Sequence, residues 1–231
     1  MSGGMFALIV VLSVICGVAF AIYKAREEAR RREALASWAL SKKLTFSPDR
    51  VNGMKRRFPL FDCLRQGSYG YALNVMEGDY AGRPILAFDC HREMGSRQSK
   101  GRTQHDQYFF SAVVLFSPVP LKPLLIRSEE QGDKLASVVG SEPINFELAE
   151  FNRKFFVKSP DRKWAYDVLH ARTIEFLLAS PQFKIQLEPR CVIAWRDARF
   201  TAPEFEQAAE VAKGILDRLP EYVVKQQQAE G

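Results

Sequence analysis

Cys90, His91 and His105 are the residues whose types could support metal or thiol chemistry. A zinc site needs four ligands, commonly in paired C-x-x-C or H-x-x-x-H spacings. Cys90 and His91 are instead adjacent in a segment with strand character, where neighbouring side chains point to opposite faces. We therefore predict that Cys90 is a small core residue, that His91 lies at the surface, and that they hold no metal.

Nucleophilic and nucleotide chemistry have no better support. The chain contains no G-x-S-x-G, no Walker-type loop and no G-x-G-x-x-G. His170 falls on a predicted helix, where a packed or solvated histidine is commoner than a catalytic base. We therefore expect no cofactor and no catalytic residue, and a non-catalytic protein is favoured over an enzyme.

The segment 93–107 keeps an alternative open, because it is polar, glycine-bearing and basic. It contains Arg97, Lys100 and Arg102, for which a solvated loop is the default interpretation and contact with anionic lipid or an acidic partner is the functional one. A pocket that collected Asp89, His91 and this loop would instead favour an enzyme of unrecognised family acting near a membrane.

A membrane anchor is the element that positions everything else. Residues 5–23 are nineteen uncharged, mostly apolar residues. As a helix they would span roughly 28 Å, close to the hydrocarbon core of a bilayer at ~30 Å. Residues 1–4 carry no Lys or Arg, whereas Lys24, Arg26 and the run Arg30, Arg31 and Arg32 follow the span. Basic flanks stay on the cytoplasmic side, so we predict an uncleaved anchor with the C-terminal part in the cytoplasm.

The net charge of +6 is concentrated beside this anchor. Residues 24–57 hold eleven Lys and Arg against four Asp and Glu, which gives +7, and residues 58–231 give −1. A neutral domain lacks the basic surface that a phosphate backbone requires, so we expect no nucleic-acid partner. We predict that Arg30, Arg31 and Arg32 face lipid headgroups. The three cysteines beyond the span form no close pair, which suits reduced thiols in the cytoplasm.

Residues 24–43 predict a helix that continues the anchor, because they lack Gly and Pro and place Glu27 and Glu28 four residues before Arg31 and Arg32. Small residues recur every four positions along the span, at Ser13, Gly17 and Ala21. Such a face allows two membrane helices to approach closely, so self-association is a candidate function for it, although small residues are also common in anchors.

Beyond residue 47 the pattern predicts an α+β domain with a mainly antiparallel sheet and two packed helices. Strand signals at 71–76, 84–92, 108–116 and 121–127 precede a helix predicted from Asp161 to Ala179 and a hairpin over 183–196. The last helix has a capping box at Thr201 and Glu204 and stops at Pro220. We predict an anchor at 1–23, a juxtamembrane helix or linker at 24–46, a domain at 47–222 that could divide near 140, and a polar tail at 223–231.

The run FNRKFFVKSPDRKWA, residues 151–165, leads from a strand into a helix. Its F-x-x-x-F-x-V-x-S-x-D-x-x-x-A pattern resembles that of uncharacterised bacterial membrane-anchored families. The resemblance covers roughly residues 58–220 and implies a single-pass protein of the bacterial inner membrane with an α+β domain. It implies no catalytic residue, because those families have no assigned activity.

The hypothesis that best fits these observations is a membrane-tethered, non-catalytic binding or scaffolding module on the cytoplasmic face. Its expected partners are the lipid bilayer and another protein, which could be a second copy of this chain. An anionic-lipid-sensing module and an enzyme are the alternatives.

Overall fold

The computed structural model describes residues 2–65, 69–94, 106–128 and 143–230. Its first element is a single helix, α1 (Ser2–Ser41), of 40 residues. No Gly or Pro interrupts residues 18–41, so nothing in the sequence breaks the helix where the apolar run ends at Tyr23. The predicted continuation of the anchor is therefore confirmed. In the described part of the chain, α1 is the one helix long and apolar enough to cross a membrane.

The domain is built on one antiparallel sheet, which confirms the predicted α+β class. Its strand order is β1-β3-β4-β5-β9-β8-β6-β7, and β2 also pairs with β3. The strands are β1 (Thr45–Ser47), β2 (Val51–Asn52), β3 (Tyr69–Tyr80), β4 (Arg83–Met94), β5 (Asp106–Phe116), β6 (Leu124–Ser128), β7 (Phe155–Lys158), β8 (Lys184–Glu188) and β9 (Cys191–Arg196). Strand β6 lies between β7 and β8, so strands from before and after residue 140 belong to one sheet.

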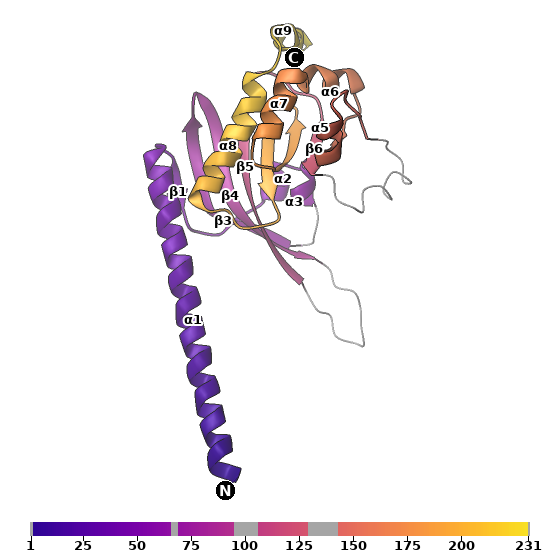
Figure 1. The fold of residues 1–231 in the computed structure, drawn as a ribbon. Coiled ribbons are helices and arrows are strands. Elements are labelled where there is room, and N and C mark those ends of the chain that lie inside the picture. Colours follow the sequence, from indigo (N-terminus) through magenta and orange to yellow (C-terminus); the bar gives the residue numbers. More distant parts are fainter. Residues whose placement is uncertain (1, 66–68, 95–105, 129–142, 231) are drawn as a thin grey trace.

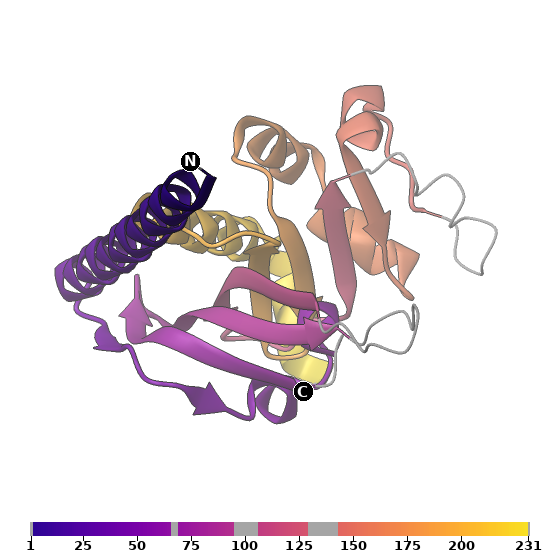
Figure 2. The ribbon, with the colours of Figure 1, turned by 90° about the horizontal axis from the view of Figure 1, so that it is seen from below.

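Helices cover both faces of the sheet and enclose a core on each. The end of α1 and α8 (Ala202–Asp217) cover one face, where Leu35 and Phe205 are buried with Met76, Ala87 and Val113. The short α2 (Met54–Arg57) and α3 (Asp62–Arg65) cover the opposite face. Figure 2 shows α1 and α8 together on one side of the sheet and α2 on the other. The remaining helices are α5 (Ala149–Lys154), α6 (Arg162–Val168), α7 (Ala171–Ala179) and α9 (Glu221–Glu230).

The helix predicted from Asp161 to Ala179 is two helices, α6 and α7. Asp161 does cap the first, because its carboxylate accepts a hydrogen bond from the Trp164 amide at 3.0 Å. The break comes at His170, whose backbone is extended and whose Nε2 lies 2.8 Å from the carbonyl oxygen of Arg218. This bond holds the break in place through a contact 48 residues away, which no local pattern reveals.

The C-terminal segment also differs from the predicted polar tail. Residues from Glu221 to Glu230 form α9, and within it Val223 and Gln227 are buried. The capping box of α8 is confirmed, since the Thr201 amide donates to the Glu204 carboxylate at 2.8 Å.

Candidate functional site

The junction between α1 and the sheet is centred on an ion pair between Arg31 and Asp89. The two guanidinium nitrogens of Arg31 lie 2.7 and 2.8 Å from the two carboxylate oxygens of Asp89, in a bidentate arrangement. The Asp89 side chain is 1% exposed and that of Arg31 is 17% exposed. Arg31 also donates from Nε and from a terminal nitrogen to the carbonyl oxygen of Phe200, at 3.0 and 2.7 Å. One side chain of α1 thus bonds to β4 and to the segment preceding α8.

Two further residues complete the surroundings of Asp89. The Asn74 amide donates to Asp89 at 2.7 Å, and the Ser111 hydroxyl donates at 2.5 Å. Asn74 has a positive φ of 50° at the irregularity in the pairing of β3 with β4, which turns its side chain toward the carboxylate. Ser111 in turn accepts a hydrogen bond from the Phe200 amide at 2.8 Å. With four donor contacts on its two oxygens, the Asp89 carboxylate joins α1, β3 and β5.

Apolar contacts extend the junction beyond this polar group. Leu35, Trp38 and Ala39 of α1 are buried in the domain core. The Trp38 ring stacks on Phe205 of α8 with centroids 6.0 Å apart, and its indole nitrogen lies 3.3 Å from the Glu206 carboxylate. An ion pair lies at each end of the part of α1 that contacts the domain. Arg199 pairs with Glu28 at 2.7 Å, and Lys42 pairs with Glu206 at 2.6 Å. The docked part of α1 therefore covers about four turns.

The Lys42–Glu206 pair predicts a weak dependence of stability on pH. The hydrogen bond from Lys42 holds the pKa of the Glu206 carboxyl below its ordinary value of 4.5. Because the folded pKa is the lower one, the pair stabilises the protein above pH 4.5 and loses its effect as pH falls through the folded pKa. Glu206 is 42% exposed, so solvent screening limits the contribution to below about 1 kcal/mol. The free energy of unfolding can be measured from pH 7 to pH 3. That of Glu206→Gln should be lower than that of wild type at pH 7 and equal to it at pH 3.

Cys90 and His91 lie on opposite faces of β4. Cys90 is buried in the core beneath α2 and α3, as predicted, and burial raises the pKa of its thiol to about 12. The prediction that His91 lies at the surface is wrong, because it is 6% exposed. Its ring packs between Tyr71 of β3 and Phe109 of β5, with centroids 4.7 and 4.8 Å away. The sheet register places Tyr71, His91 and Phe109 next to one another on adjacent strands. A histidine packed between two aromatic rings can lie in the interior.

The pocket that would favour an enzyme combines Asp89 and His91 with the segment 93–107, of which residues 95–105 lie outside the described residues. Asp89 is fully engaged, His91 lies between two rings, and no group of three His, Cys, Asp or Glu side chains in the described part of the chain could hold a metal ion. His105 lies outside the described residues.

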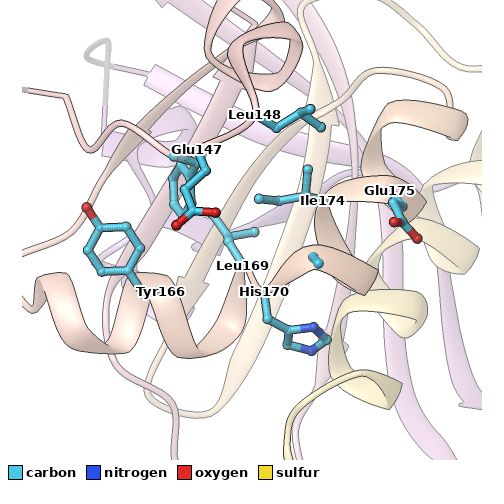
Figure 3. Close-up of a pocket in the computed structure, with 9 residues that line it drawn as sticks. Glu147, Leu148, Tyr166, Leu169, His170, Ile174 and Glu175 are labelled. Carbon is cyan, nitrogen blue, oxygen red and sulfur yellow. The ribbon is translucent and has the colours of Figure 1, made fainter.

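A cavity of about 490 Å³ opens at the other end of the domain, beside α7. Its walls come from the segment before α5, from α6, and from the start of α7. Figure 3 shows Glu147 and Glu175 on either side of Ile174, with Leu169 and His170 below. The complete lining is Phe146, Glu147, Leu148, Tyr166, Leu169, His170, Ala171, Ile174 and Glu175. The surface is mainly apolar with two carboxylates, which suits binding better than catalysis.

Comparison with known proteins gives one informative result. The chain is similar in fold to the mycobacterial trehalose monomycolate transport factor A, TtfA. The crystal structure of TtfA superposes with a TM-score of 0.55 over 81% of this chain and 92% of the TtfA chain, at 14% sequence identity. No protein-family model matches the chain, and no curated protein matches its sequence. At this level of identity the similarity to TtfA is a similarity of fold.

The structure separates the residues that the sequence singled out as contacts. Of the three juxtamembrane arginines, Arg31 points into the domain, whereas Arg30 is exposed and Arg32 lies 3.5 Å from Glu28 on an exposed face. Contact of these arginines with lipid stays a prediction. Arg97, Lys100 and Arg102 lie outside the described residues. Ser13, Gly17 and Ala21 are exposed along the apolar half of α1, where their role in self-association also stays a prediction.

Proposed function

We propose that the protein is a non-catalytic accessory module that holds its α+β domain at a fixed height and orientation above the membrane and binds a partner protein there. The observation that carries this proposal is the continuity of α1. One unbroken helix contains the apolar span and also contributes Leu35, Trp38 and the Arg31 guanidinium to the domain. A flexible linker would be sufficient for simple tethering, so a rigid, bonded connection favours a function that depends on geometry.

The helix sets the height of the domain. Glu28 is five residues beyond the end of the apolar run at Tyr23, which is about 7.5 Å along the axis, and Arg31 follows at about 12 Å. The headgroup layer adds roughly 5–7 Å to each side of the hydrocarbon core. The Arg199–Glu28 ion pair would therefore lie at the outer edge of the headgroups. Figure 1 shows the end of β4 and the start of β5 on the same side as the N-terminal half of α1, so this edge of the domain would face the membrane.

The charge distribution supports a cytoplasmic location for the domain, and the fold similarity supports a role in membrane transport. The basic residues that follow the span favour a cytoplasmic domain. TtfA, to which this chain is similar in fold, is by name a trehalose monomycolate transport factor. We extend this to an accessory role in a membrane transport process, in which the domain positions or binds another membrane component rather than carrying out a reaction.

Insertions in α1 test whether height and direction matter. Seven helix-forming residues between Ala25 and Arg26 would raise the domain by about 10 Å with nearly the same rotational phase, and two residues would turn it by about 200° with only ~3 Å of lift. Photo-cross-linking in intact membranes, from a reactive residue on the domain surface, should give a partner adduct in wild type that both insertions abolish or strongly reduce.

The matched control carries the same seven residues appended after Gly231 and should retain the adduct. Equal cross-linking in wild type, the two insertion variants and the control would contradict a fixed geometry. Simple tethering of the domain would then be sufficient for its function. A reporter fused at the C-terminus, active only in the cytoplasm, checks the predicted side independently.

A further inference from the structure

We propose that the cavity beside α7 binds a segment of the partner protein that presents a positively charged side chain flanked by apolar groups. This inference rests on the proposed binding function and names the chemistry of the partner. The cavity volume of about 490 Å³ falls within the ~300–1,000 Å³ typical of ligand sites. Three features of its lining determine what would fit: its apolar walls, its charge and its position.

The apolar walls are rigid and in part exposed. Leu169 and Ile174 are buried in the main core, whereas Leu148 and Tyr166 at the rim are each 43% exposed. The Tyr166 hydroxyl donates to the carbonyl oxygen of Asn145 at 3.1 Å, and its ring packs edge-on against Phe146 with centroids 5.2 Å apart. Aromatic and aliphatic groups held in this way offer contact area without a large entropy cost on binding.

The charge of the lining is negative. Glu147 and Glu175 are exposed at the cavity, and within the described residues neither has an ion-pair partner. No lysine or arginine belongs to the lining given above. Exposed carboxylates that face an apolar surface complement a guanidinium or ammonium group, and such pairs contribute more to partner choice than to affinity.

The carboxylates of Glu147 and Glu175 accept hydrogen bonds, so they favour a ligand that donates them. His170 lines the same wall, but its Nε2 is already engaged, at 2.8 Å from the carbonyl oxygen of Arg218 and 3.3 Å from the Thr173 hydroxyl.

The position of the cavity favours a protein over a lipid. Figure 1 shows α6 and α7 at the end of the domain away from the N-terminal half of α1. A partner that reaches this end extends past the membrane surface into solution. Lipid headgroups would meet the opposite end of the domain, where β4 ends and β5 begins.

Two probes of the same shape and opposite charge test the inference. Phenethylammonium and 3-phenylpropionate can be titrated against the full-length protein in detergent micelles by ligand-observed NMR. We expect the ammonium probe to bind at least fivefold more tightly than the carboxylate probe, with the difference decreasing at high salt. The double variant Glu147→Gln, Glu175→Gln should lower the affinity for the ammonium probe at least fivefold. It should also remove the preference for the ammonium probe over the carboxylate probe.

Matched variants separate charge from shape. Glu221→Gln removes an exposed carboxylate of α9 outside the cavity and should leave both affinities within twofold. Tyr166→Ala should weaken both probes to a similar extent. Equal binding of the two probes to wild type, no binding of either, or an unchanged ammonium affinity in the double variant would overturn the inference. The variant with the seven-residue insertion in α1 should bind the ammonium probe like wild type. The probe titration therefore tests the cavity, whereas the cross-linking experiment tests the fixed geometry, and either proposal can fail without the other.

Discussion

Replacing Asp89 with alanine is expected to lower the free energy of unfolding by about 3–5 kcal/mol, the typical cost of removing one partner of a buried ion pair. The substitution leaves the Arg31 guanidinium without its carboxylate in a site that is 17% exposed. It also removes the acceptor of the Asn74 amide and of the Ser111 hydroxyl, both of which are buried. Unsatisfied buried donors then add to the cost of the uncompensated charge.

Denaturant unfolding of the full-length protein in detergent micelles measures this effect. Arg31→Ala should cost a similar amount, because it leaves the buried carboxylate unpaired, and the double variant should lose less than the two single losses combined. Arg30→Ala is the matched control, since Arg30 is the exposed neighbour on the same helix and should change stability by no more than about 0.5 kcal/mol. A loss below about 1 kcal/mol for Asp89→Ala would show that the junction does not depend on this ion pair.

The elements that the sequence predicted well carry their signal locally. A helix long and apolar enough to cross a membrane follows from an uninterrupted run of uncharged residues, and its continuation follows from good helix formers without Gly or Pro. The capping box at Thr201 and Glu204, followed by an apolar periodicity, predicts helix α8. Each of these patterns depends on residues within a few positions of one another, so local physical chemistry is sufficient to define them.

The junction could not be predicted in the same way, because its partners are far apart in the sequence. Arg31 and Asp89 are separated by 58 residues, and Arg31 and Phe200 by 169. One signal was nevertheless present. Alternation along β4 places Asp89 on the same face as Ile85 and Ala87, which are buried. An acid among apolar residues on one strand face indicates a buried partner, although it does not say which arginine supplies it.

The cavity depends on tertiary contacts for a similar reason. Its carboxylates, Glu147 and Glu175, come from segments on either side of β7 and α6. The break at His170 that starts α7 is fixed by a carbonyl at the end of α8. A continuous helix through this point would not leave the short turn whose residues Leu169 and His170 line the cavity.

Trp38→Ala is expected to cost about 3–5 kcal/mol, the range for deleting a large aromatic side chain from a core. Trp38 is 7% exposed and stacks on Phe205, which is completely buried in α8. Its loss would leave a void between α1 and α8 and remove the hydrogen bond to Glu206. The Arg31–Asp89 group would remain, so we expect α1 to loosen first at its C-terminal end.

Amide hydrogen exchange distinguishes this loosening from general unfolding. In Trp38→Ala, amides of residues 35–41 should exchange faster, while those of α8 and the central strands keep most of their protection. Leu40→Ala is the matched control, because Leu40 lies two residues away on α1 and is 79% exposed. Unchanged exchange at residues 35–41 in Trp38→Ala would show that the polar group alone holds α1. Combining Trp38→Ala with Arg31→Ala should then free the whole docked segment while the apolar span stays in the membrane, which converts a rigid support into a flexible tether without shortening it.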